Sequence, residues 1–180
     1  MFIVKAQLSN YQQVVDEAAE SKVGMPALSV TFDVGGTRYC TYIIVQRQIR
    51  RNNHTAMPGL YEILYCSEVA PEQPSTIVPD ILTGARASNL RLDVTGVLIF
   101  DGQYFLQLIE GESETVRALM NRIENDPRHH TVLRLAQQAS PARRFTRFSM
   151  GYCYAEGTHT VDNVKALDGT AAIDALKIGR

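Results

Sequence analysis

The stretch VTGVLIFDGQYFLQLIEG, residues 94–111, decides the fold of this chain. Two apolar runs flank Asp101-Gly102, a dipeptide typical of a two-residue turn between antiparallel strands. In that register Gln107 faces Gly96 and Phe105 faces Leu98 on one side of the sheet. The sequence therefore predicts a β-hairpin in which Gly96 leaves room beside the Gln107 amide.

Gln107 is the polar exception in the second of these strands. A buried amide needs partners for two N–H donors and one carbonyl acceptor. A structural glutamine bonded to backbone groups, or a strand at the sheet edge with its glutamine in water, would satisfy that need. The residues alone favour these two explanations over a functional one.

The segments around the hairpin alternate between strand and helix patterns. Residues 61–67 (YEILYCS) form a short apolar run typical of a buried strand. A helix is expected from about Val78, with Pro79 in its first turn, where a missing N–H is harmless. A second helix is expected from an N-cap at Ser113 to about Asp126, which precedes a proline.

Residues 131–138 and 148–154 supply two further strands. The order β-α-β-β-α-β-β predicts an α+β domain with both helices on one face of the sheet.

The two ends of the chain form separate expected regions. Residues 1–56 make an extension of unknown role, with a capped helix at 9–24 and a hairpin around Gly35-Gly36 that places Phe32 opposite Tyr39 and Asp33 opposite Arg38. This extension docks on the rest, stays loose, or precedes the natural start of the protein at Met57. Residues 57–155 form the main domain, and residues 156–180 form a tail of one or two short helices broken at Gly169.

Composition excludes several classes of protein. Hydrophobic residues make up 45% of the chain and charged residues 21%, with a net charge of -1, so there is no electrostatic reason to expect nucleic acid or an anionic membrane as partner. No run approaches the roughly 20 apolar residues of a membrane span, and the N-terminus does not resemble a signal peptide. The three cysteines favour a cytoplasmic protein, and no metal site is expected.

Several polar residues have ordinary structural explanations. Tyr65 suits a core tyrosine and Asn89 a helix C-cap. Arg122 and Asp126 suit a surface ion pair at i, i+4, and His129 suits an exposed position.

Five sequence blocks, however, resemble one family in order and spacing. They are LYCS (64–67), SNLRLDVTGVLIF (88–100), FLQLIEGE (105–112), RIENDPRHH (122–130) and RRFTRFSMGY (143–152). Together they resemble the BLUF domain, a bacterial blue-light sensor that uses flavin, over about residues 60–155. The resemblance implies a ferredoxin-like fold with a mixed sheet, and FAD or FMN held without a covalent bond between the two helices.

The resemblance also implies a role for three residues of a photoactive switch. Tyr65 would supply an electron and a proton to the excited flavin. Gln107 would lie between Tyr65 and the flavin, and its amide would change its hydrogen bonds by rotation or tautomerisation. Met150 would neighbour that amide.

The remaining residues implied by the resemblance would bind the cofactor. Ile81 would pack on the flavin ring, and Ser88 and Asn89 would lie near its pyrimidine side. The positions that match contacts with the ribityl chain and phosphate are Arg122, Asp126 and His129. Two residues depart from the family pattern: Phe148 replaces a frequent tryptophan, and Ser88 replaces a histidine or asparagine.

The sequence thus favours a short, non-enzymatic blue-light photoreceptor. Its output would pass through the tail, through self-association into a homo-oligomer, or through a separate signalling protein. One alternative is a ferredoxin-like interaction scaffold with weak or lost flavin binding. The other is an oxidoreductase that uses its flavin in turnover.

Overall fold

The computed structural model describes residues 28–34, 37–43, 59–74, 76–145, 150–154, 160–167 and 169–174. The predicted helix at 9–24, the start at Met57 and the substitution at Phe148 lie outside these residues.

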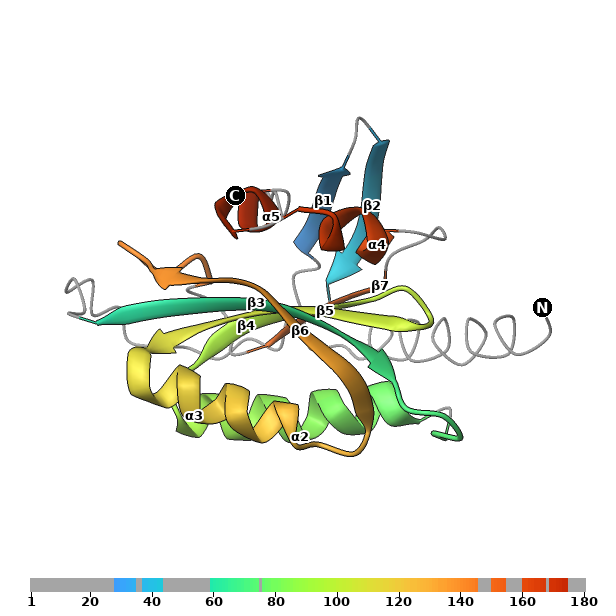
Figure 1. Ribbon diagram of the computed structural model, residues 1–180, viewed down its shortest axis with the longest axis horizontal. Helices are drawn as coiled ribbons and strands as arrows, with labels where there is room; N and C mark the ends of the chain where they lie inside the picture. Colours follow the sequence, from blue (N-terminus) through green and yellow to red (C-terminus); the bar gives the residue numbers. More distant parts are fainter. Residues whose placement is uncertain are drawn as a thin grey trace, which may run out of the picture.

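The central feature is a five-stranded mixed sheet with a pair of helices on one face (Figure 1). Its strands, in spatial order, are β6 (His129–Ala139), β3 (Leu60–Val69), β5 (Tyr104–Glu112), β4 (Thr95–Phe100) and β7 (Gly151–Tyr154). The two helices are α2 (Ile77–Arg91) and α3 (Ser113–Glu124). The ferredoxin-like order and the placement of both helices on one face are confirmed.

Two interleaved β-α-β units produce this order. β5 pairs antiparallel with both β3 and β4, so β3 and β4 run parallel with β5 between them. In the same way β3 lies antiparallel between β5 and β6. Each helix crosses over the strand inserted into its unit, which brings α2 and α3 side by side on the same face (Figure 1).

The helix ends differ from the predicted ones in two places. The N-cap of α3 is Glu112, not Ser113: its carboxylate accepts from the backbone N–H groups of Glu114 at 3.1 Å and Thr115 at 2.8 Å. The helix therefore begins one residue earlier than predicted, and the Glu112 carboxylate satisfies two of the N–H donors of its first turn. Helix α2 continues to Arg91, so Asn89 lies within its last turn and is not the C-cap.

The register of the central hairpin is shifted by two residues from the prediction. Gln107 faces Leu98 rather than Gly96, and Phe105 faces Phe100. The cause is Asp101, whose Oδ1 accepts from the backbone N–H groups of Gln103 at 3.1 Å and Tyr104 at 2.8 Å. These bonds draw Gln103 and Tyr104 into a longer turn. Because side chains alternate between the two faces of a strand, a shift of two residues leaves each side chain on its predicted face.

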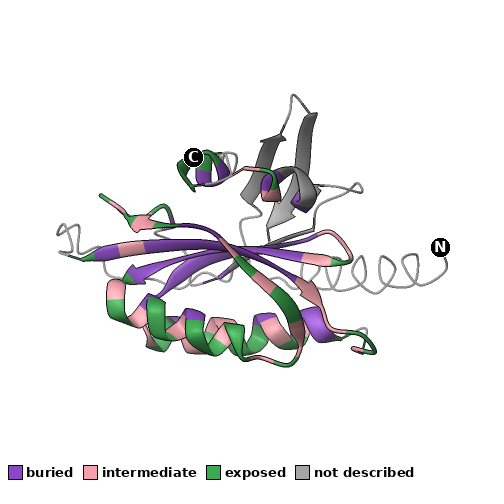
Figure 2. Cartoon of the chain, viewed as in Figure 1, coloured by how far each residue is buried: buried purple, intermediate pink, exposed green. Residues whose placement is uncertain are grey.

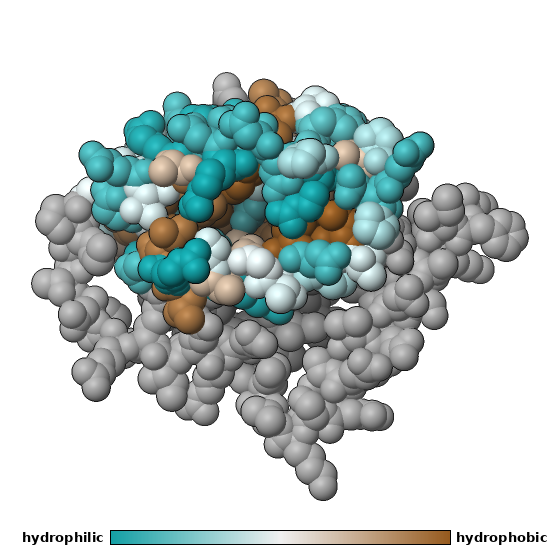
Figure 3. Space-filling model, turned by 90° about the horizontal axis from the view of Figure 1, so that it is seen from below, coloured by the Kyte–Doolittle hydropathy of each residue, from teal (hydrophilic) through white to brown (hydrophobic). Residues whose placement is uncertain are grey.

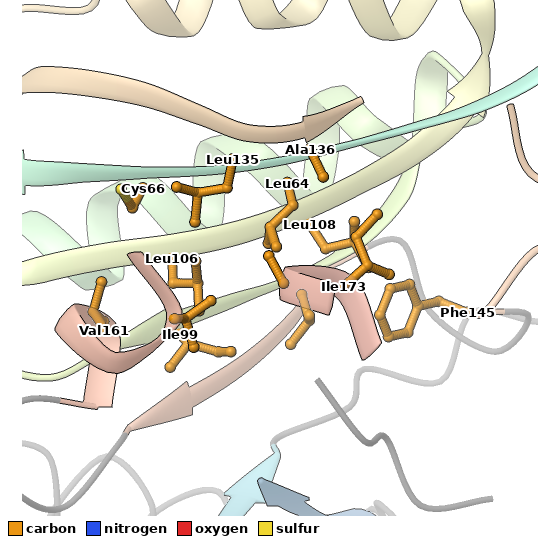
Figure 4. Close-up of a cluster of buried hydrophobic side chains, with 13 residues drawn as sticks. Leu64, Cys66, Ile99, Leu106, Leu108, Leu135, Ala136, Phe145, Val161 and Ile173 are labelled. Atoms are coloured by element: carbon orange, nitrogen blue, oxygen red, sulfur yellow. The ribbon is translucent and has the colours of Figure 1, made fainter. Parts of the chain in front are cut away.

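The face opposite α2 and α3 is covered by the tail. It forms two short helices, α4 (Thr160–Lys165) and α5 (Gly169–Asp174), which confirms the expected break near Gly169. Val161 and Ile173 are fully buried there against Leu106 and Leu108 of β5 (Figure 4). Figure 2 shows the consequence, since the strands of the sheet are largely buried while the outer faces of α2 and α3 are exposed.

The predicted N-terminal hairpin is also present. β1 (Leu28–Val34) pairs antiparallel with β2 (Thr37–Ile43), with Phe32 opposite Tyr39 and Asp33 opposite Arg38 as expected. β2 lies beside β7, and β1 lies beside α4. Among the described residues, no helix is long and apolar enough to cross a membrane.

Gly96 has a packing role that provides a test of the hairpin register. A Cβ at this position would lie 2.2 Å from the backbone oxygen of Leu108 on β5. We expect Gly96→Ala to lower the free energy of unfolding by about 1–3 kcal/mol, because the two strands must separate.

The matched control is Gly84→Ala in α2, where a Cβ would meet nothing within 4 Å. It should raise the stability of the cofactor-free protein by up to about 1 kcal/mol, because alanine loses less backbone entropy in a helix. Urea unfolding of both variants without cofactor is the measurement. Equal stability of Gly96→Ala and the parent protein would contradict the register.

Candidate functional site

A cavity of about 310 Å³ lies between the sheet and the two helices α2 and α3. Figure 3 looks onto this helix face, where a hollow with apolar walls opens between polar rims. Its lining residues are Tyr65, Ile81, Gly84, Ala85, Ser88, Asn89, Leu98, Phe105, Gln107, Leu119, Arg122, Ile123, Asp126, Arg128 and His129.

The strand register brings the central side chains of the site together. Tyr65 on β3 pairs with Gln107 on β5, and Gln107 pairs with Leu98 on β4. The three residues therefore form one row across the sheet on the face toward the helices. Tyr65 is 3% exposed and Gln107 is 6% exposed, so both polar groups are withdrawn from water.

Two hydrogen bonds orient the Gln107 amide within this row. The Tyr65 hydroxyl donates to Gln107 Oε1. On its other side, Gln107 Nε2 donates to the sulfur of Met150, which lies 3.6 Å away and is itself buried. Because a thioether sulfur is only a weak acceptor, the amide N–H groups are held less firmly than the carbonyl.

Tyr65 is a neutral phenol in this setting. Burial raises its pKa far above the ordinary value, and the negative charge of Asp126 adds to the increase. Removal of the whole proton to water is therefore strongly disfavoured. Transfer of the Tyr65 proton to a nearby buried group is therefore favoured over its loss to water.

The α2 side of the cavity carries Ile81 and, two helical turns later, the neighbouring residues Ser88 and Asn89. Asn89 is only 2% exposed, and its backbone carbonyl accepts from the N–H of Val94 at 2.9 Å. This bond fixes the last turn of α2, and so fixes a buried amide group at the cavity wall.

Charged residues gather at the α3 end, where one pairing differs from the expectation. Asp126 pairs with Arg128 rather than Arg122: the Arg128 Nε lies 2.9 Å and 3.0 Å from the two carboxylate oxygens. The turn after α3 folds Arg128 back onto Asp126, whereas Arg122 points to the exposed rim of the cavity. The pairing lowers the pKa of the Asp126 carboxyl.

His129 is half-buried, not exposed as a surface histidine would be. Its Nδ1 lies 2.8 Å from the hydroxyl oxygen of Ser67, two residues beyond Tyr65 on β3. Its ring also meets the ring of Phe105 edge-on, with the centroids 6.2 Å apart. These contacts hold the imidazole at the wall of the cavity.

The cavity thus collects all eight residues that the sequence pointed to as cofactor-binding, and Met150 lies directly behind Gln107. Sequence reasoning did not assign Gly84, Leu98, Leu119 or Arg128 to the site. Arg128 lies within the block RIENDPRHH, two residues after Asp126 and one before His129. This closeness in the sequence could have indicated that Arg128 belongs to the site.

The side chains that line the cavity suit a flat heteroaromatic ring. The walls are apolar, from Ile81, Leu98, Phe105 and Leu119, whereas polar groups stand at separate points of the rim and floor. A few placed polar groups in an apolar cavity of this size are typical of small-molecule and cofactor sites. The described part of the chain has no cluster of side chains suited to a metal ion.

Comparison with known proteins agrees with this geometry. The family described as "Sensors of blue-light using FAD" (BLUF) matches residues 60–151, more than half of the chain. The chain belongs to the BLUF family.

Individual relatives give the same assignment. The chain is 35% identical over 91 residues to the "Blue light- and temperature-regulated antirepressor BluF" of Escherichia coli K12, which covers 51% of this chain and 23% of that protein. It is 28% identical to BlrB, a BLUF protein whose dark-state structure matches with a TM-score of 0.51 over 66% of this chain and 98% of that one. The ground state of BlsA also matches at 28% identity and a TM-score of 0.51, over 58% of this chain and 70% of that one.

The chain spans about a quarter or less of the length of the curated relatives that it matches. One of these is the "Photoactivated adenylate cyclase subunit alpha" of Euglena gracilis, 27% identical over 110 residues, which are 60% of this chain and 11% of that protein. The similarity to these two relatives therefore concerns the BLUF domain.

His129 makes the stability of the BLUF domain depend on pH. Burial lowers the pKa of its imidazole below the ordinary value, and the Asp126 carboxylate opposes that effect only in part. Below about pH 6.5 the unfolded chain takes up a proton that the folded ring resists, so the free energy of unfolding should fall as the solution is acidified.

The measurement is urea unfolding between pH 8 and pH 5. We expect His129→Gln to flatten the pH dependence, because the substitution removes the half-buried imidazole. The same slope in His129→Gln and the parent protein would show that another group is responsible.

Proposed function

We propose that this protein is a blue-light photoreceptor in which Tyr65 and Gln107 form a hydrogen-bond switch. The observation that carries the proposal is a chain of hydrogen bonds from Tyr65 through the Gln107 amide to Met150. This chain lies beside a cofactor-sized cavity. A filled core at this place would have favoured the scaffold alternative instead.

The residues around the cavity would hold FAD or FMN. Ile81 and Leu98 provide apolar surface for the ring, and the Asn89 amide provides a donor and an acceptor for its polar edge. Ser88 lies beside Asn89, and Arg122, Asp126 and His129 would contact the ribityl chain and phosphate. A bound flavin would supply the blue-light absorption and a transient acceptor for an electron and a proton from a nearby phenol.

Tyr65 is suited to act as that phenol. Because burial keeps it neutral, it can give up a hydrogen to the interior and take it back, but it does not ionise into water. While its proton is absent, the hydrogen bond to Gln107 Oε1 is lost and the amide is free to rotate or tautomerise. When the proton returns to Tyr65, the amide has already adopted a second arrangement.

The two arrangements of the amide are not equal. In the resting one the carbonyl accepts from Tyr65 and an N–H group donates to Met150. In the rotated one the N–H group meets the hydroxyl of Tyr65, which can accept, but the carbonyl faces a sulfur that has no hydrogen to donate. An acceptor without a partner in a buried site costs about 1–3 kcal/mol, so the lit arrangement should decay in the dark.

Output would pass from β5 to the tail helices. Leu106 and Leu108, which flank Gln107, point to the opposite face and pack with Val161 and Ile173. A shift of β5 would therefore alter how α4 and α5 sit on the sheet, and with it self-association or the binding of a signalling partner. We propose no catalytic turnover for this chain.

The boundaries follow from the same arrangement. We propose that residues 57–155 form the flavin-binding domain, because the cavity lies wholly within them. Residues 1–56 would be dispensable for flavin binding, which the experiment below tests when it is repeated on residues 57–180. A cytoplasmic location is proposed from the three widely spaced cysteines.

The switch is tested by absorption spectroscopy before and after blue light. We expect the purified protein to be yellow and to show a small, reversible red shift. Gln107→Leu and Tyr65→Phe should keep the flavin and lose the shift, because each removes one side of the bond between phenol and amide.

The matched controls are Tyr61→Phe on the same strand and Gln137→Leu on the exposed edge strand β6, neither of which lines the cavity. Both should shift like the parent protein. A full red shift in Gln107→Leu or Tyr65→Phe would refute the assigned roles, and a colourless protein that takes up no added flavin would refute the photoreceptor.

The output route is tested by hydrogen exchange in the dark and under continuous blue light. We expect α4 and α5 to lose protection in the light, because their buried side chains share one apolar cluster with Leu106 and Leu108 of β5. Helix α3, which packs on the other face, serves as the internal reference. Equal protection of residues 160–174 in both states would exclude this route.

A further inference from the structure

Ser67 is a fully buried polar residue that the switch does not use. It lies on β3 two residues after Tyr65, so its side chain points to the same face of the sheet, toward the cavity helices. Its hydroxyl oxygen lies 2.8 Å from Nδ1 of His129, at the start of β6. A buried hydroxyl is costly unless it is hydrogen-bonded, which makes this partner informative.

An irregularity in the pairing of β3 with β6 directs His129, and not His130, toward the cavity. Arg134, further along β6, faces α3, where it bonds to a carboxylate. Regular alternation from Arg134 would place His130 on that same face. The register shifts opposite Ser67, however, where β6 accommodates an extra residue and Thr131 has a φ of 52°. The shift exchanges the two faces, so His129 is the histidine that lines the cavity.

Three elements hold the ring of His129 in place. Ser67 on β3 bonds to Nδ1, and the ring of Phe105 on β5 meets the imidazole edge-on with the centroids 6.2 Å apart. The backbone of Ile123, near the end of α3, adds a further hydrogen bond. The imidazole therefore has a defined orientation between the sheet and α3.

The hydroxyl of Ser67 suits both protonation states of this ring. When Nδ1 of a neutral imidazole carries no hydrogen, the hydroxyl donates to it; when an imidazolium carries a hydrogen on Nδ1, the hydroxyl accepts. Its own hydrogen rotates to serve either arrangement, so the heavy atoms need not move. His129 can therefore take up a proton at Nδ1 and keep its partner.

Several charged side chains surround this ring. The charges of Asp126, Arg128 and His130 act on His129, and Asp80 at the start of α2 acts on Arg128. Asp126 and Arg128 pair with each other, and the pairing holds the pKa of the Asp126 carboxyl below its ordinary value. Among side chains of these types, only imidazole ordinarily changes its charge near pH 7.

We propose that Ser67 is a positioning residue for the phosphate end of the flavin site: it holds His129 so that Nδ1 takes up a proton from solution when a flavin that carries phosphate binds. The inference deepens the proposed function and rests on it. Because Asp126 and Arg128 largely neutralise each other, the pyrophosphate of FAD adds negative charge that favours the imidazolium. Riboflavin, which has no phosphate, leaves His129 neutral.

The experiment measures proton uptake by calorimetry when the full-length protein, freed of flavin, is titrated with FAD or with riboflavin. Titrations at pH 7 in Pipes and in Bis-tris, which differ in ionisation enthalpy, give the number of protons bound per flavin. FAD is the probe because its pyrophosphate neither gains nor loses a proton near this pH. We expect roughly half a proton or more per FAD, and almost none per riboflavin.

Two variants assign the uptake to the proposed pair. Ser67→Ala removes the acceptor for the hydrogen on Nδ1, so the uptake should fall and the preference for FAD over riboflavin should drop about fivefold. His129→Gln should abolish the uptake, which separates His129 from His130. The matched control is Ser140→Ala, just beyond the far end of β6 and outside the cavity lining, which should leave the uptake unchanged.

A second readout follows His129 directly, in the dark. With the histidine rings labelled with ¹³C, the His129 signal, assigned by His129→Gln, should titrate at higher pH with FAD bound than with riboflavin bound. Ser67→Ala should reduce the difference between the two midpoints. If Ser67→Ala does not fold, Ser67→Cys keeps a side chain of similar size with a weaker acceptor and should change both readouts in the same direction.

Equal proton uptake with FAD and riboflavin would overturn the inference, as would uptake that survives in His129→Gln or parental values of both readouts in Ser67→Ala. A normal red shift in such a protein would leave the photoswitch intact. Conversely, the expected uptake without any light-induced shift would refute the switch alone. A protein that binds neither flavin would refute the photoreceptor and this inference together.

Discussion

The hydrogen bond from the Tyr65 hydroxyl to Gln107 Oε1 joins two neutral polar groups in the middle of an apolar sheet face. It exists only because β3 and β5 pair in one register, which sets the two residues directly opposite each other. A slip of one residue would turn one of the two side chains to the tail face and leave the other buried without its partner. The site therefore depends on the same pairing that builds the sheet.

β5 is the element that connects the two faces. Gln107 lines the cavity, whereas Leu106, Leu108 and Glu110 face the tail and the loop before β7. In the proposed switch, a rearrangement at Gln107 would act on a strand whose other side packs with the tail helices and bonds to the loop after β6. Gly96 tightens this coupling, because it allows the backbones of β4 and β5 to approach closely.

Much of this arrangement could be predicted from local patterns, since periodicity identified the strands, both cavity helices and the two tail helices. The register of the central hairpin could not, because Asp101 closes a longer turn with its own side chain than the dipeptide rule provides. The ion-pair partner of Asp126 was predicted wrongly for a related reason. Helical spacing favoured Arg122, but the chain turns after α3 and brings Arg128 against the Asp126 carboxylate. Such bonds depend on where a turn directs the chain, which periodicity does not encode.

The two faces of the sheet differ in how they can respond to the switch. On the cavity face, the proposed switch would exchange the hydrogen bonds that the Gln107 amide makes with Tyr65 and Met150. The tail face is densely packed, and close-packed interiors transmit small shifts instead of absorbing them. At the edge of this packed face lies the buried carboxyl group of Glu110. Burial raises its pKa although the surrounding hydrogen-bond donors act in the opposite direction, so the loss of any of these bonds would destabilise the buried carboxylate. The loop after β6 and the tail helices are therefore the elements through which the proposed switch would act on the rest of the molecule.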